Sequence, residues 1–253
     1  MRTLKTLNAL LSLLAFIAIS GQAQTASVAV AANMKDAFVE IDTAFRANGK
    51  KPLRVIYGSS GNFAAQIMNG APFNLLVSAD EQFPLELYKN GKTIDAGRVY
   101  AIGRIALLTK KNSGLKLGAD KAELAQAIAS ANKVAVAKPE LAPYGRAAIE
   151  YLKAAGLWDL VKDKLVYADN VSVATMYVAS GAADLGFTAS SLAQSPELAK
   201  DTHYLILNDA LYKPIRQRMV LMKGAPQEAL DLYAFIQSTT GKNILLKHGY
   251  IVP

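Results

Sequence analysis

The chain has 253 residues, 28 of them Lys or Arg and 20 Asp or Glu, which gives a formal net charge of +8. It has no cysteine and two histidines, which excludes disulfides and cysteine metal sites and leaves little for a histidine-based zinc site or catalytic triad. Basic residues are spread along the chain without a run longer than two, which argues against a nucleic-acid binder.

The N-terminal segment predicts export. Arg2 and Lys5 precede an uncharged, mostly apolar run over residues 9–19, and Gly21-Gln22-Ala23 supplies small residues where a signal peptidase cleaves. The run is shorter than the roughly 20 residues that a membrane-spanning helix needs. We therefore interpret residues 1–23 as a cleavable signal peptide and expect the mature protein to begin near Gln24.

Strands and helices alternate after this segment. Hydrophobic periodicity predicts strands at 27–32, 53–57 and 75–78 and helices at 35–47, 63–68 and 83–89. A second set follows, with helices at 121–131, 146–155 and 173–180 and strands at 134–137, 165–168 and 184–188. Such alternation favours parallel sheets flanked by helices.

Two long extended runs, residues 100–110 and 215–223, bracket the second set, and a helical segment at 227–248 returns to the first lobe. The pattern predicts an α/β protein of two doubly wound lobes joined by two crossover strands. We place lobe 1 at residues 24–102 and 216–253, and lobe 2 at residues 103–215.

Four loops share one pattern, because each follows a predicted strand and opens a predicted helix. They are Ala31-Ala32-Asn33-Met34, Gly58-Ser59-Ser60-Gly61, Ala142-Pro143-Tyr144-Gly145 and Asn170-Val171-Ser172. Helix N-termini carry unpaired N–H groups that can hold an oxyanion without a full positive charge. Ligands of such sheets bind beyond the carboxyl ends of the strands, so two loops from each lobe predict an anion site in a closing interlobe cleft.

Each of these residues also has a purely structural interpretation. Ser59, Ser60 and Asn33 could cap their helices, and Val171 alone is typical of a core residue. Asp80 and Glu81 are interpreted as caps of the following helix rather than as metal or acid–base carboxylates, with Asp80 also tying the cleft loops together.

An enzyme is the competing class. Gly58-Ser59-Ser60-Gly61 does not match the nucleophile elbow G-x-S-x-G, and no histidine lies in a cleft loop to act as a general base for Ser60. We expect a binding protein with no catalytic residues and no cofactor.

Seven stretches resemble, in order and spacing, the periplasmic molybdate-binding proteins of ABC importers: AANMKDAF, YGSSGNFAAQIMNGAP, SADE, YAIG, KPELAPYG, NVSVA and SGAADLGF. The resemblance spans residues 27–250. It implies the type II periplasmic-binding-protein fold, a periplasmic location, and a monomer that delivers molybdate or tungstate to a membrane permease. It also implies that neutral donors hold the oxyanion, with no direct protein ligand to molybdenum.

The resemblance assigns site residues one by one. Asn33 stands where the family supplies a side-chain and a backbone donor, and Ser60 matches a serine that donates through Oγ and N–H. Tyr144 and Val171 match backbone donors. Ala32 replaces a hydroxyl residue found in one branch of the family, so it offers only its N–H. A tyrosine that some members carry after the Leu-Gly pair is missing, because Phe187, Thr188 and Ala189 follow Leu185-Gly186 here.

Other anions remain alternatives for the same architecture. Phosphate keeps a proton near neutral pH and benefits from an acceptor carboxylate, which the four loops lack. Sulfate, like molybdate, is fully ionised and needs donors only. The sequence therefore leaves a binding protein for another tetrahedral oxyanion such as sulfate, or for a small carboxylate, as the alternative function.

Overall fold

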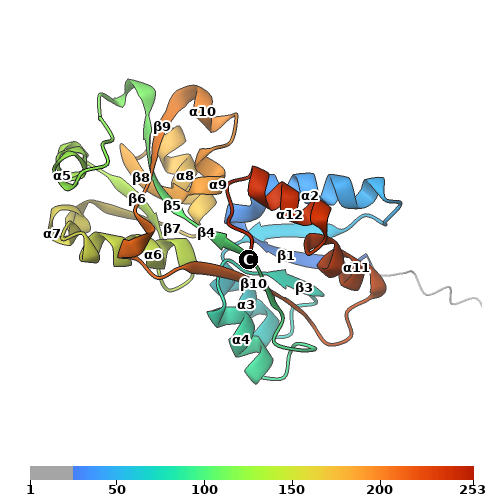
Figure 1. Ribbon diagram of the computed structural model, residues 1–253. Coiled ribbons are helices and arrows are strands. Elements are labelled where there is room, and N and C mark those ends of the chain that lie inside the picture. Colours follow the sequence, from blue (N-terminus) through green and yellow to red (C-terminus); the bar gives the residue numbers. More distant parts are fainter. Residues whose placement is uncertain (1–24) are drawn as a thin grey trace, which may run out of the picture.

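The computed structural model describes residues 25–253 as two α/β lobes, each built on a five-stranded sheet (Figure 1). The two-lobe α/β fold expected from the sequence is confirmed. The predicted signal peptide, residues 1–23, and the predicted start at Gln24 lie outside the described residues. Within residues 25–253, every helix is too short or too polar to span a bilayer.

Lobe 1 contains the sheet with strand order β2-β1-β3-β10-β4. Strand β1 is parallel to β2 and β3, whereas β10 runs antiparallel to β3 and β4. The strands are β1 (Ser27–Ala31), β2 (Arg54–Gly58), β3 (Leu75–Val77), β4 (Arg98–Gly103) and β10 (Ile215–Leu221). The helices are η1 (Ala32–Met34), α2 (Lys35–Ala47), α3 (Ser60–Met68), α4 (Gln82–Lys89), α11 (Gln227–Ile236) and α12 (Thr239–Lys247).

Both faces of this sheet are covered. Apolar side chains of α2, α11 and α12, among them Phe38, Leu232 and Leu245, form one core cluster with the sheet. Phe63 and Leu87 from α3 and α4 belong to a second cluster on other sheet residues. Alternate residues of a strand point to opposite faces, so β1 contributes Val28 and Val30 to the first cluster and Ala29 to the second.

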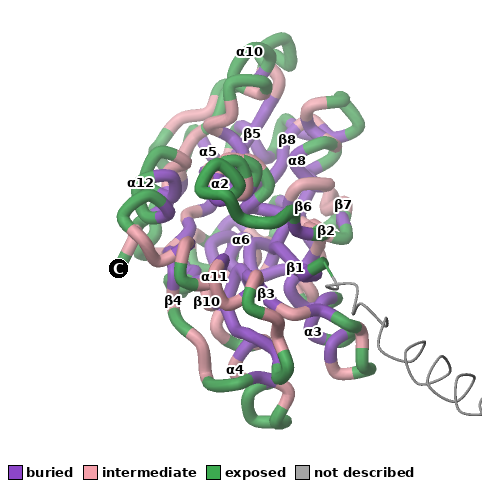
Figure 2. Tube along the Cα trace, turned by 90° about the vertical axis from the view of Figure 1, so that its right-hand side faces the viewer, coloured by how far each residue is buried: buried purple, intermediate pink, exposed green. Residues whose placement is uncertain are grey.

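Lobe 2 has the strand order β7-β6-β8-β5-β9. Its strands are β5 (Ile105–Lys110), β6 (Val134–Ala137), β7 (Leu165–Ala168), β8 (Leu185–Ala189) and β9 (Thr202–Ile206). Its α-helices are α5 (Lys121–Ser130), α6 (Pro143–Ala154), α7 (Trp158–Val161), α8 (Val171–Ala179), α9 (Ser190–Ala193) and α10 (Leu198–Asp201). Three short 3-10 helices are η2 (Lys111–Ser113), η3 (Lys162–Lys164) and η4 (Asp209–Leu211). Figure 2 shows the central strands of both sheets mostly buried, while long stretches of the helices are exposed.

The crossover segments differ from the expectation of two long strands. The run 100–110 forms two strands, and the chain changes sheets at Arg104, because Gly103 pairs with Ile215 in lobe 1 and Ile105 pairs with Ala189 in lobe 2. One straight strand cannot pair with both sheets. Strand β10 stays in lobe 1, so the return crossing lies before it, within residues 207–214.

The C-terminal helical segment also differs from the prediction of one helix over 227–248. It consists of α11 and α12, separated at Gln237 and Ser238. Ser238 is the N-cap of α12, and its Oγ accepts a hydrogen bond from the N–H of Gly241 at 3.2 Å. A capping serine inside a helical pattern starts a new helix because it satisfies an otherwise unpaired N–H.

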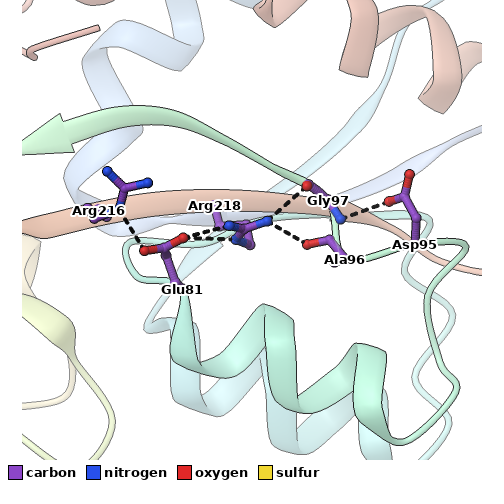
Figure 3. A network of polar contacts seen from close by, with 6 residues as sticks. All are labelled: Glu81, Asp95, Ala96, Gly97, Arg216 and Arg218. Atoms are coloured by element: carbon purple, nitrogen blue, oxygen red, sulfur yellow. Dashed lines mark hydrogen bonds and ion pairs between the residues drawn. The ribbon is translucent and has the colours of Figure 1, made fainter. Parts of the chain in front are cut away.

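A network around Arg218 fixes the loop before α4 to the return strand β10 (Figure 3). Arg218 Nη2 donates to Glu81 at 2.6 Å, and Arg218 Nη1 donates to the carbonyl oxygens of Ala96 and Gly97 at 2.9 Å each. Arg216 Nε donates to the other Glu81 oxygen at 2.7 Å. Burial tends to raise the pKa of Glu81, but the hydrogen bonds from Arg218 and Arg216 outweigh it and lower that pKa. The loop that carries Asp80 and Glu81 is therefore held on lobe 1.

We expect Gly97→Ala to destabilise lobe 1 far more than Gly49→Ala. Both glycines have positive φ, 68° and 73°, so both variants incur about 1–2 kcal/mol of left-handed strain. A Cβ at Gly97 would also lie 2.0 Å from the carbonyl oxygen of Met219, whereas nothing lies within 4 Å of one at Gly49. Overpacking adds about 1–3 kcal/mol. Denaturant unfolding of both variants measures the difference, and equal free energies of unfolding would contradict this packing.

Candidate functional site

All four predicted loops line one small cavity between the lobes. Lobe 1 supplies residues 31–33, 58–60 and Ala79, and lobe 2 supplies residues 142–144, 170 and 171. No charged side chain is among these lining residues. The described part of the chain also contains no group of three or more His, Cys, Asp or Glu side chains placed to hold a metal ion.

Helix N-termini converge on this cavity. Asn33, Ser60, Tyr144 and Val171 lie in the first turns of η1, α3, α6 and α8, where N–H groups have no acceptor within the helix. Among residues 25–253 we find no other acceptor for these four N–H groups. The four residues are at most 4% exposed. The arrangement thus presents neutral donors from both lobes to a site shielded from water, which suits a dehydrated anion.

The two serines do not act as helix caps. Ser59 is the N-cap residue of α3, yet its side chain makes no capping bond, and its buried Oγ has no partner among the described residues. Ser60 Oγ accepts a hydrogen bond from the N–H of Ala79 at 2.9 Å, which leaves its own hydrogen free to donate. Neither hydroxyl contacts a general base in the described structure.

Asn33 lines the cavity, but its side-chain amide nitrogen is hydrogen-bonded to residues that do not line it. Asn33 Nδ2 donates to Gln217 Oε1 and to the hydroxyl of Tyr250, both at 2.9 Å. Its Oδ1 is buried without a partner in the described residues. The side chain makes no capping bond for η1.

Sequence reasoning missed Gln217, although a signal was present. Along β10, Ile215, Gln217 and Met219 are buried, while Arg216 is exposed and Arg218 is half-buried. A glutamine on the apolar side of an alternating strand needs a buried hydrogen-bonding partner.

Tyr144, Asn170 and Val171 line the cavity from lobe 2. Tyr144 Oη accepts a hydrogen bond from Gln217 Nε2 at 3.0 Å, and burial raises the pKa of the Tyr144 hydroxyl well above its ordinary value. Asn170 caps α8, because its Oδ1 accepts from the N–H of Val173 at 3.0 Å. The N–H of Val171 remains available at the cavity.

Direct contacts hold the cleft closed. The N–H of Gly61 in lobe 1 donates to the carbonyl oxygen of Leu141 in lobe 2 at 2.9 Å. Arg146 of α6 reaches across to form an ion pair with Asp80 and lies 5.7 Å from the ring centre of Phe83. Burial raises the pKa of Asp80, although Arg146 opposes that shift.

The two acidic residues of this loop differ in role. Asp80 Oδ1 accepts from the N–H of Phe83 at 3.3 Å, so the predicted helix cap is confirmed for Asp80. The predicted cap at Glu81 is wrong, because Glu81 makes no capping bond and binds Arg216 and Arg218 instead. The nearby guanidinium groups are stronger partners for a carboxylate than a backbone N–H.

Comparison with known proteins gives consistent matches over nearly the whole described chain. Residues 26–251 match the family model described as bacterial extracellular solute-binding protein. The molybdate-binding protein ModA of Azotobacter vinelandii is 32% identical over 238 residues, which cover 92% of this chain and 92% of the relative. The protein of the same name from Rhodobacter capsulatus is 32% identical over 253 residues, covering 99% and 97%.

A solved structure agrees. The periplasmic molybdate-binding protein of Azotobacter vinelandii superposes with a TM-score of 0.81 and 29% sequence identity, covering 90% of this chain and 99% of that one.

We expect Gly61→Ala to prevent full closure of the cleft. A Cβ at Gly61 would lie 2.9 Å from Leu141 Cα and 2.9 Å from the ring of Phe83, closer than carbon atoms approach. Small-angle X-ray scattering should give a larger radius of gyration for Gly61→Ala than for wild type under identical conditions. Asn62→Ala, at the exposed neighbouring position, is the matched control. Identical scattering from Gly61→Ala and wild type would show that this contact does not limit closure.

Proposed function

This chain belongs to the bacterial extracellular solute-binding proteins, and we propose that it captures molybdate between its lobes and delivers it to the membrane permease of an ABC importer. Support comes from the relatives at 32% identity, which are named molybdate-binding proteins. The observation that carries the proposal is a buried interlobe cavity lined by neutral donors with no carboxylate among them.

The proposed binding residues are Asn33, Ser60, Tyr144 and Val171, with the N–H of Ala32 as a further donor. A tetrahedral dianion accepts hydrogen bonds at every oxygen and donates none, so a site made only of donors matches it. Hydrogen bonds to charged groups contribute about 1.5–3 kcal/mol each, and several together offset the loss of water around the anion.

We add Ser59 to this set. Its buried hydroxyl lines the cavity and lacks any partner in the described residues, and such a group normally has one. An oxyanion oxygen would provide the acceptor. This differs from the interpretation of Ser59 as a helix cap.

Tungstate, which has the same charge and shape, belongs to the same proposal, and sulfate is the second candidate. Donors alone do not separate these dianions, so the size of the closed cavity must select among them. We further propose export through the signal peptide at residues 1–23, a periplasmic location, and a monomer that exposes both lobes to the permease.

Calorimetric titration tests the ligand. We expect one molybdate or tungstate per chain and an affinity for sulfate at least tenfold lower, which corresponds to about 1.4 kcal/mol. Phosphate should bind more weakly still, because its proton would find no acceptor in the cavity. Equal affinities for sulfate and molybdate would overturn the assignment of molybdate, and the absence of binding to any oxyanion would overturn the function.

The two serines should respond differently to truncation. Ser60→Ala should weaken molybdate binding about 10- to 150-fold, and it should also lower the free energy of unfolding by about 1–3 kcal/mol, because the buried N–H of Ala79 loses its acceptor. Ser59→Ala should weaken binding without lowering the stability of the empty protein, since its hydroxyl has no partner to lose. Calorimetry and thermal unfolding without ligand separate the two effects. Wild-type affinity in either variant would remove that serine from the site.

A further inference from the structure

A buried amide lies directly behind the cavity and joins residues of both lobes. Gln217 is completely buried. Its Oε1 accepts from Asn33 Nδ2 and from the hydroxyl of Tyr100, both at 2.9 Å, and its Nε2 donates to Tyr144 Oη at 3.0 Å. Asn33 and Tyr144 are the proposed donors from the first loop of lobe 1 and the first loop of lobe 2. Gln217 therefore contacts two binding loops while lying outside the residues that line the cavity.

Two groups in this network are left unsatisfied. Asn33 Oδ1 is buried and has no partner, and the hydroxyl hydrogen of Tyr144 has no acceptor among the described residues. Asn33 lines the cavity, and its Nδ2 donates to Gln217 and Tyr250. Of the two amide atoms, Oδ1 is therefore the one that remains to face the cavity. An amide oxygen repels an anion, so this orientation opposes the binding of one.

Turning both amides by 180° gives both groups a partner and keeps every heavy-atom distance. Asn33 Oδ1 then lies 2.9 Å from Tyr250 Oη, so the Tyr250 hydroxyl donates to it, and the carbonyl oxygen of Asn33 keeps the hydroxyl of Ser191 as its donor at 3.0 Å. Gln217 Nε2 then donates to Asn33 Oδ1 and to Tyr100 Oη, and Tyr100 donates in turn to the carbonyl oxygen of Ser78, 2.9 Å away. Gln217 Oε1 then accepts from the hydroxyl of Tyr144. Asn33 Nδ2 then occupies the position that Oδ1 held without a partner, and it can donate a hydrogen bond to a ligand in the cavity.

We propose that Gln217 is a positioning residue, which in the anion complex donates to Asn33 Oδ1 and so turns Asn33 Nδ2 toward the bound oxyanion. The proposal rests on the proposed function, because it concerns how that site obtains one of its donors. Gln217 acts through Asn33 and touches no ligand.

Only an amide fits position 217 in this role. The amide can donate to Asn33 and Tyr100 on one side while it accepts from Tyr144 on the other, and a carboxylate or an apolar side chain cannot do both. The surrounding hydroxyls are neutral, because burial raises the pKa values of Tyr100 and Tyr144. Gly103 leaves the necessary room, since a Cβ there would lie 2.6 Å from Gln217 Nε2 and 2.1 Å from Tyr144 Oη.

A double-mutant cycle tests the dependence on Asn33. Calorimetry with sodium molybdate compares wild type, Gln217→Met, Asn33→Ala and the double variant, each checked for folding by thermal unfolding. We expect each single variant to bind about tenfold or more weakly, and the double variant to lose clearly less than the product of the two single losses, because the part of the Gln217 effect that acts through Asn33 is already lost in Asn33→Ala. Tyr100→Phe is the control, because it removes a hydrogen bond to the same amide inside lobe 1 and should change affinity less than threefold.

Additive losses in the double variant, or wild-type affinity of Gln217→Met, would overturn the proposal. Neutron diffraction from deuterium-exchanged crystals of wild type with molybdate gives a test that does not depend on any variant. Deuterium should appear on the Asn33 amide atom that faces the anion, and deuterium on the atom that faces Gln217 would contradict the proposal. Failure of wild type to bind molybdate would instead overturn the proposed function, and this inference with it.

Discussion

The structure depends on closing two lobes over a cavity that contains polar groups but no charge. Removing an ion from water is costly unless hydrogen bonds replace its hydration. The chain has an excess of basic residues, yet its charged side chains near the cleft are compensated in pairs at the rim, as Arg146 is by Asp80 and Arg218 by Glu81. The cavity itself offers only N–H and hydroxyl donors, and the hydrogen bonds they form become stronger when water is excluded.

Strand pairing explains why the donors come together. Parallel strands end at the same edge of a sheet, and the register pairs Ala31 with Gly58 in lobe 1 and Ala137 with Ala168 in lobe 2. Each pair of strand ends therefore delivers two loops side by side, and the facing edges of the two sheets bring all four together. The positions of the loops follow from the sheets, while the identity of the loop residues decides what is bound.

The spacing of apolar residues along the chain was sufficient to predict most of the alternating strands and helices. The helix predicted at 35–47 has the bounds of α2, because its apolar residues recur with helical spacing and bury one face. Strand β9 and the short helices α7, α9 and α10 were not predicted. Four residues make barely one helical turn, and β9 is an edge strand without a buried apolar run. The hydrogen-bond partners of Asn33 could not be predicted from local sequence patterns, because Gln217 and Tyr250 lie 184 and 217 residues away in the chain.

The network behind the cavity also bears on how easily the lobes separate. Tyr250 Oη donates to the carbonyl oxygen of Asn33 at 2.8 Å within lobe 1 and lies 3.0 Å from Ser191 Oγ of lobe 2. Opening would break the contacts to Ser191 and Tyr144 but keep those among Asn33, Gln217 and Tyr100. Water would replace the broken bonds, each of which contributes only about 0.5–1.5 kcal/mol net. The first binding loop thus stays ordered on lobe 1 in either state, and an anion that adds several charge-assisted bonds is sufficient to favour closure.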